Sequence, residues 1–283
     1  MAKNKSSYLT VLEVHTNNPK RDSVFHSEIE LLLQSRAELI ILVEGISDKK
    51  LMDKFYQNYY NSTYVLFPPD VTGESAGGWT NVQKTVSTID RQTLIGIIDV
   101  DFKNIDKEFT LPAKIFFTDA HDMEMMILQS AKVISSIKAE FDFEVNLDTI
   151  IEKLKYITML RFYQYRTKLK INFNRIHDID KNSKLTLDEL VAKFKDVPIN
   201  INEVAELESE VKSNFFQMYN GHDVSKIIAI NITKEDQKNS ISYETLERVM
   251  RCAYQISDFE KTKLAKQITS YCSIHNINLK ESN

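Results

Sequence analysis

Three groups of carboxylate side chains follow short apolar runs in the first half of the chain. Their members are Glu44 with Asp48, Asp99 with Asp101, and Asp119 with Asp122 and Glu124. Carboxylates held close together repel and raise one another's pKa values unless a cation lies between them. Their hard oxygen atoms favour Mg²⁺ or Mn²⁺, ions that stabilise the charge developing on an attacked phosphodiester and activate the attacking water. The pattern therefore predicts a metal site that acts on phosphate esters.

Short apolar runs predict the strands that position these carboxylates. The expected strands are 39–43, 63–67, 93–102 and 113–119, and the expected helices around them are 23–38, 47–60 and 81–90. Continuous apolar strands alternating with helices are typical of a parallel sheet flanked by helices, an α/β fold. Ligands bind beyond the carboxyl ends of such strands, which is where all three acidic groups fall. If the third strand continues to residue 102, Asp99 and Asp101 point to the same side.

The pattern changes to long helical segments from about residue 122. These segments are 122–140, 148–170, 186–196, 201–219 and 243–275. We therefore expect an α/β catalytic domain over residues 1–130 and a mostly helical domain over 131–283. Asn-Gly-His-Asp at 220–223 contains the last of six glycines, and we interpret it as a turn between helices with Gly221 as a C-cap. The role of this turn stays open.

The motifs around the first two acidic groups resemble the Toprim domain of topoisomerases, bacterial primases and several nucleases. They are VEGISD at 43–48 and IIDVD at 97–101. VEGISDKKL, GIIDVDF, TDAHDMEMMIL and the late NGHDV resemble more narrowly the Toprim-like family to which the nuclease subunit of PARIS phage-defence systems belongs. This resemblance implies a Toprim-like parallel sheet with a helical C-terminal half.

The resemblance also implies roles for individual residues. Glu44 matches the Toprim glutamate, a general acid/base or metal ligand, and Asp99 and Asp101 match the metal-binding pair. Asp48 matches a second acid of related nucleases, although an acid at a helix start is common for structural reasons alone. Glu124 would be an outer or second-metal ligand. The implied activity is that of a Mg²⁺- or Mn²⁺-dependent endonuclease that acts on RNA (including tRNA) or on DNA. The implied role is that of a regulated toxic effector of antiviral defence with an ABC-type ATPase partner.

One segment, 153–170, is the most basic part of an otherwise acidic chain. Its cationic residues are Lys153, Lys155, Arg161, Arg166, Lys168 and Lys170, interleaved with aromatic residues. These features favour a nucleic-acid-binding helix or a docking site for a protein partner. The alternative is a solvated face on a helix that buries Leu154, Ile157 and Leu160.

Composition excludes several broad classes. The chain has 36 basic and 40 acidic residues, so its net charge does not favour non-specific binding of nucleic acid. A local basic groove that binds nucleic acid is still compatible with this composition. Two cysteines cannot build a disulfide framework or a zinc site, which favours a reducing cytoplasm. No apolar run approaches the roughly 18 residues of a membrane span. Whether the chain forms a homodimer, and whether it binds one metal ion or two, stays open.

Two other functions fit the same residues. IIDVDF also resembles the nucleophilic strand of haloacid-dehalogenase-type phosphohydrolases, with Asp99 as the nucleophile, but Lys103 stands where that class normally has Thr or Val. The second alternative is a non-catalytic sensor that binds only a partner. A Walker-like glycine spacing at 73–80 has Trp79 where the phosphate-binding lysine is needed, which argues against an ATPase.

Overall fold

The computed structural model describes residues 21–35, 37–57, 60, 62–68, 78–105, 112–236 and 240–279. It has an all-parallel four-stranded sheet with flanking helices and a mostly helical C-terminal part, which confirms the predicted α/β class. The Walker-like loop lies largely outside the described residues. Within them, no helix is both long enough and apolar enough to cross a membrane.

The sheet is built from four strands in the order β2-β1-β3-β4. Their bounds are β1 Leu39–Leu42, β2 Thr63–Leu66, β3 Leu94–Ile98 and β4 Ile115–Phe117. β1 and β3 are buried along their whole length, as a central strand covered on both faces must be. They pair in parallel, with Ile40 opposite Leu94 and Leu42 opposite Gly96. The carboxyl ends of β1 and β3 therefore lie side by side at one edge of the sheet.

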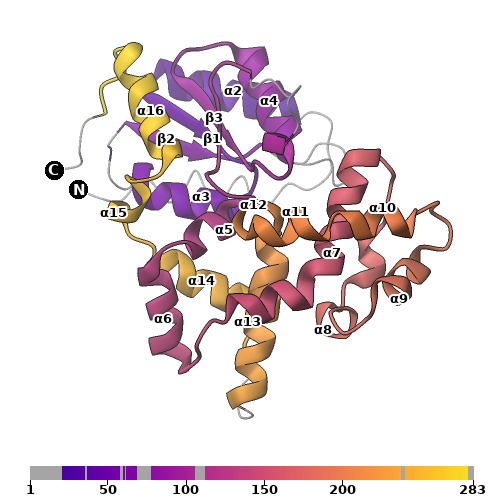
Figure 1. Cartoon of the computed structure of the whole chain (residues 1–283). Coiled ribbons are helices and arrows are strands. Elements are labelled where there is room, and N and C mark those ends of the chain that lie inside the picture. The colour runs from indigo at the N-terminus through magenta and orange to yellow at the C-terminus, as the bar shows by residue number, and fades with distance from the viewer. Residues whose placement is uncertain are drawn as a thin grey trace. The chain divides into compact units, whose positions relative to one another are not determined.

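Helices accompany the sheet along the first part of the chain, drawn in indigo to purple in Figure 1. They are α2 Arg21–Gln34, α3 Ile46–Met52, which continues as a π-helical turn at Asp53–Gln57, and α4 Gly78–Ile89. α4 packs closely on β3, because a Cβ atom at Gly96 would lie only 2.6 Å from Val82 Cγ1. The late helix α16, Lys263–Ile274, also contacts this part of the chain, since Tyr271 donates a hydrogen bond to the carbonyl oxygen of Gln92, just before β3 (2.9 Å).

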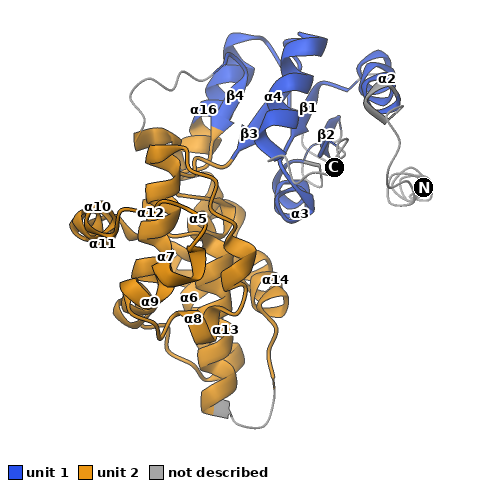
Figure 2. Ribbon diagram, turned by 90° about the vertical axis from the view of Figure 1, so that its right-hand side faces the viewer, with its two compact units in different colours: residues 1–98, 111–116, 267–283 blue, residues 99–110, 117–266 orange. Residues whose placement is uncertain are grey.

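The chain divides into two compact units, coloured blue and orange in Figure 2. Unit 1 comprises residues 1–98, 111–116 and 267–283, and unit 2 comprises residues 99–110 and 117–266. This division differs from the domains expected at 1–130 and 131–283, because segments on either side of residue 130 group with the helical unit and the C-terminal segment groups with the sheet.

Unit 2 is a set of helices around an apolar core. They are α5 Met123–Leu128, α6 Ala131–Phe141, α7 Leu147–Thr167, α8 Ile179–Asn182, α9 Leu187–Val191, α10 Ile201–Glu206, α11 Glu208–Ser213, α12 Phe215–Met218, α13 Gly221–Asp236, α14 Tyr243–Ala253 and α15 Ile256–Phe259. Leu154, Ile157 and Leu160 of α7 are buried, as the helical spacing predicts. Most of the long segments that were expected to be helical thus contain several short helices.

Candidate metal centre

Glu44 lies two residues after β1, in unit 1, and the start of α4 packs against it. A Cβ atom at Gly78 would lie 2.6 Å from the Glu44 carbonyl oxygen and 2.8 Å from Glu44 Cβ. Real Cβ atoms do not approach neighbours so closely, so only glycine allows the first turn of α4 to lie here. This contact fixes the backbone of Glu44 at the carboxyl end of β1.

Asp48 is a buried residue in the first turn of α3. Its Oδ2 atom accepts a hydrogen bond from the Gly45 backbone N–H (3.1 Å), which satisfies one of the free donors at the helix start. The structural role that we kept as an alternative for Asp48 is therefore present. Its role as a metal ligand stays a prediction.

Asp99 and Asp101 follow β3 and belong to unit 2. β3 ends at Ile98 and Asp101 has a left-handed backbone (φ 46°), so the expected continuation of the strand to residue 102 is wrong. The buried Lys103 side chain donates to the Asp99 carbonyl oxygen (3.0 Å) and forms an ion pair with the Asp101 carboxylate. A cation from the chain itself thus accompanies Asp101. A metal ion there would share this carboxylate with Lys103.

The five expected metal ligands fall in different units. Glu44 and Asp48 belong to unit 1, whereas Asp99, Asp101 and Glu124 belong to unit 2. The five-residue site therefore stays a prediction. What the sheet shows is that the acidic motifs come directly after two neighbouring parallel strands, β1 and β3.

A second cluster of metal-ligating side chains lies wholly within unit 2. Glu124 in the first turn of α5, His222 in the first turn of α13 and Glu247 in α14 each offer one ligand atom, and these atoms lie within 4.8 Å of one another. Glu124 and Glu247 are only 5% and 4% exposed. The His222 side chain is 49% exposed, and its Nδ1 atom lies 2.7 Å from Glu247 Oε1. The cluster thus has two buried carboxylates and one imidazole that solvent reaches.

Asp122 joins the helix starts that carry Glu124 and His222. Its Oδ1 atom accepts the Met125 N–H (2.9 Å) as the N-cap of α5, and its Oδ2 atom accepts the Gly221 N–H (2.6 Å). His121 Nδ1 lies 3.3 Å from the same Oδ2 atom. The carboxylate of Asp122 therefore couples α5 to α13.

Gly221 begins α13 instead of ending a helix, so our interpretation of it as a C-cap is wrong. A Cβ atom there would lie 2.3 Å from Asp122 Oδ1 and 2.5 Å from Glu124 Cβ. The helix start can reach Asp122 only because residue 221 has no side chain. The next residues of the motif face other partners: His222 meets Glu247, and Asp223 pairs with Arg161 (2.8 Å).

The electrostatics of the cluster follow from burial and from these contacts. Burial alone would raise the pKa of Asp122, but His121 and the N–H groups of Gly221 and Met125 lower it below its usual range. The hydrogen bond to Glu247 raises the pKa of His222 to about 9 against the opposing effect of burial, and the Glu124 carboxylate adds to the rise. Without a metal ion, His222 therefore carries a proton at neutral pH.

Sequence reasoning found part of this cluster. It selected Glu124 as a ligand and the Asn-Gly-His-Asp motif as unexplained, but it missed His222 and Glu247 as partners. The position of His222 in that motif was a usable signal. Glu247 gave none, because it is one acid among 40 acidic residues, in an amphipathic helix.

The basic segment lies mainly on α7, and acidic side chains accompany several of its cations. Arg166 binds Glu210 through two hydrogen bonds (2.9 and 2.7 Å), and Lys155 pairs with Glu152 (2.7 Å). Arg161 pairs with Asp223 as described above. Lys168 lies over the ring of Tyr165, and Lys170 is exposed beyond the end of the helix. A phosphate on α7 would have to compete with these acids, and the nucleic-acid-binding role of the segment stays a prediction.

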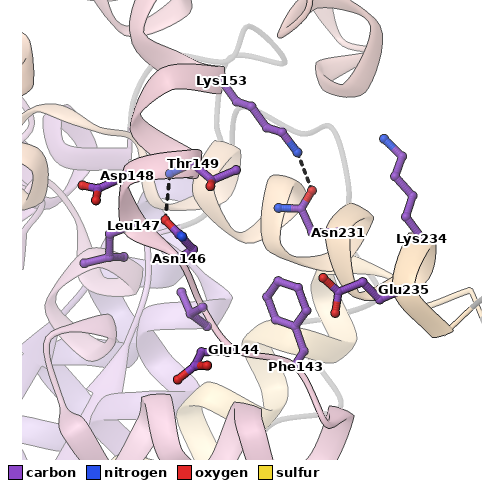
Figure 3. A pocket seen from close by; sticks show the side chains of 11 residues that line it. Phe143, Glu144, Asn146, Leu147, Asp148, Thr149, Lys153, Asn231, Lys234 and Glu235 are labelled. Atoms are coloured by element: carbon purple, nitrogen blue, oxygen red, sulfur yellow. Dashed lines mark hydrogen bonds between the residues drawn. The ribbon is translucent and has the colours of Figure 1, made fainter.

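Lys153, the first cation of this segment, lines a pocket of about 760 Å³ in unit 2. Figure 3 shows its amine pointing toward the Asn231 side chain, to which it donates a hydrogen bond (2.5 Å). Burial lowers the pKa of Lys153. The charged side chains that line the pocket are Lys153, Lys234, Glu144, Asp148 and Glu235. Because acids outnumber lysines, this pocket gives no preference for an anion.

Comparisons with models of known protein families and with curated proteins found no match for the chain.

Proposed function

We propose that the protein is a metal-dependent nuclease that hydrolyses phosphodiester bonds in RNA, tRNA included, or in DNA. The supporting observation is the order of the sheet. β1 and β3 are parallel neighbours, and their carboxyl ends lead directly into Glu44 and into the Asp99-Val-Asp101 motif. Such an edge is where open parallel sheets bind ligands.

The donor set fits a hard divalent cation, Mg²⁺ or Mn²⁺. Glu44, Asp48, Asp99 and Asp101 offer carboxylate oxygens only, which these ions prefer. When bound, such an ion stabilises negative charge on the attacked phosphate and lowers the pKa of a bound water molecule. Glu44 has the role of general acid/base, and Lys103 holds the backbone of Asp99 and the carboxylate of Asp101 in place.

The family resemblance of the sequence motifs extends the proposal to a biological setting. It suggests a toxic effector of antiviral defence, kept silent or released by an ABC-type ATPase partner, and the count of only two cysteines favours a cytoplasmic location. Assembly as a homodimer is compatible with this setting.

The test is Mg²⁺-dependent cleavage of labelled tRNA, other RNA and DNA by the purified full chain, together with growth arrest on expression. Glu44→Gln should abolish cleavage and toxicity while the far-UV spectrum and thermal midpoint stay unchanged. Glu30→Gln is the matched control, since Glu30 is a partly exposed acid of the same unit that faces Arg91 (3.8 Å). It should retain full activity.

Full cleavage by the Glu44→Gln variant would refute the proposal. An aspartyl-phosphate trapped at Asp99 would instead favour the phosphohydrolase. If the chain cleaves none of these substrates with any metal ion, even with its partner present, the non-catalytic sensor is favoured.

A further inference from the structure

We propose that Glu124, His222 and Glu247 bind a divalent transition-metal cation of the Zn²⁺ or Mn²⁺ class. All three residues belong to unit 2. The proposal therefore does not depend on the nuclease activity or on the acids that follow the strands.

The three side chains converge from separate helices. Their ligand atoms lie within 4.8 Å of one another, which a bound cation can span after small side-chain movements. Protein ligands lie about 2.0–2.2 Å from Zn²⁺, so neighbouring ligand atoms are separated by about 3.3 Å in a tetrahedral site. The His222–Glu247 contact of 2.7 Å must open slightly to admit the ion.

The charge of the cluster also favours a cation at this place. Glu124 and Glu247 are almost completely buried and face each other, and the buried Asp122 carboxylate adds a third negative charge close by. Arg251 reaches one side of Glu247, with Nη1 3.7 Å from Oε2. Buried carboxylates this close are stable only with compensating positive charge or metal coordination. Without a metal ion, Arg251 and the protonated His222 supply positive charge here. A divalent ion would take the place of the His222 proton and lie between the two carboxylates and the imidazole.

The surroundings hold two of the ligands in position before any ion binds. Asp122 fixes the first turns of α5 and α13 through the N–H groups of Met125 and Gly221. These contacts fix the backbone that carries Glu124 and His222. The half-exposed His222 side chain gives the ion a path from solvent and leaves coordination positions for water. Three protein ligands with an open position are the arrangement of catalytic zinc sites.

The ligand types select the class of ion. An imidazole suits Zn²⁺ and other transition metals, whereas carboxylates suit Mn²⁺ and harder ions. Mg²⁺ demands near-ideal octahedral oxygen coordination, so it should compete poorly here. The absence of a thiolate in the cluster disfavours soft ions such as Cu⁺.

The experiment uses Co²⁺ as a spectroscopic probe of the chelator-treated full chain, followed by competition with Zn²⁺, Mn²⁺ and Mg²⁺. We expect one high-affinity Co²⁺ ion with the ligand-field spectrum of a mixed nitrogen and oxygen site, displaced by Zn²⁺ but not by equimolar Mg²⁺. His222→Asn and Glu247→Gln should each weaken Co²⁺ binding by at least about tenfold, the lower end of the loss when even an outer partner of a metal site is removed. His177→Asn is the matched control, because His177 is an exposed histidine of the same unit and should bind as the wild type does.

Both variants alter buried charge, so a second measurement uses the wild-type protein. With isotopically labelled histidine, bound Co²⁺ should broaden the imidazole signals of His222 and leave those of His177 unchanged. The proposal is overturned if the wild type binds no Co²⁺ or Zn²⁺, or if His222→Asn binds as tightly as the wild type. It is also overturned if Glu44→Gln abolishes Co²⁺ binding while His222→Asn retains it, since the ion would then belong to the acids that follow the strands. Loss of nuclease activity in Glu44→Gln with unchanged Co²⁺ binding would leave both proposals standing separately.

Discussion

Gly221→Ala tests the close packing that couples α5 to α13. The new Cβ atom would lie 2.3 Å from Asp122 Oδ1 and 2.5 Å from Glu124 Cβ, and 3.0 Å from Asp122 Cγ. Because these atoms belong to a buried helix start, the methyl group must displace Asp122 or move α13 away from it. Either movement breaks the hydrogen bond from the Gly221 N–H to Asp122 Oδ2.

The size of the effect follows from three contributions. Inserting a methyl group into a filled core costs about 1–3 kcal/mol. Loss of a hydrogen bond to a buried charged group costs about 1.5–3 kcal/mol. Alanine stabilises the helix by about 1 kcal/mol relative to glycine, because its helix propensity is higher. We therefore expect the free energy of unfolding to fall by about 3 kcal/mol.

Urea unfolding followed by far-UV circular dichroism measures this change, and Gly45→Ala is the matched control. A Cβ atom at Gly45 would meet nothing closer than Asp48 Oδ2 at 3.8 Å, and the backbone is extended there (φ −150°). The control should lose less than about 1 kcal/mol, the effect of alanine at a helix N-cap. A Gly221→Ala protein with the urea midpoint and m-value of the wild type would refute the packing described here.

Three further predictions concern single side chains of unit 2. Asp119→Ala removes the acceptor of two backbone N–H groups at the start of α16 (2.6 and 2.7 Å), so thermal unfolding should show a loss of about 1–2 kcal/mol, and an unchanged midpoint would contradict this. Arg161→Ala leaves the buried Asp223 carboxylate without its partner (2.8 Å) and should cost about 3 kcal/mol in urea unfolding, whereas a loss below 1 kcal/mol would show that water replaces the arginine. In the metal-free protein, the raised pKa of His222, about 9 when folded against 6.5 for the free group, means that the folded state holds the proton more tightly. The stabilisation from its pair with Glu247 is therefore complete below pH 6.5 and is lost as the pH rises toward 9. Since the His222 side chain is half exposed, we expect the free energy of unfolding to fall by about 1 kcal/mol over this range. The His222→Asn variant should not show this fall.

Local sequence signals predicted the elements of the sheet because each strand is a short apolar run that must be buried. β1 begins at the expected residue 39, and β2 and β4 lie within the expected segments. β3 stops at Ile98, before Asp99, and Lys103 folds back onto the acidic turn that follows. Apolar periodicity does not report such a side-chain contact, so the end of this strand was the least predictable part of the sheet.

For the candidate sites, too, the sequence predicted some features and could not predict others. By itself, the sequence determined the α/β class and the placement of Glu44 and Asp99 after apolar strands. It also named Glu124 as a candidate metal ligand, which stays a prediction. It could not determine that Glu124 meets His222 and Glu247. Residues so far apart in the chain become neighbours only when α5, α13 and α14 pack together.

Gly221 shows the physical reason most clearly. A glycine that follows Asn220 and stands two residues before Asp223 has the composition of a turn, and nothing nearby in the chain contradicts that interpretation. Its place at the start of α13 depends on Asp122, 99 residues earlier, whose carboxylate leaves no room for a side chain. Backbone preferences act between near neighbours and can be read from sequence, whereas steric exclusion and buried charge act between any groups that the fold brings together. The tertiary structure alone therefore decided which acids share a cluster and why residue 221 is glycine.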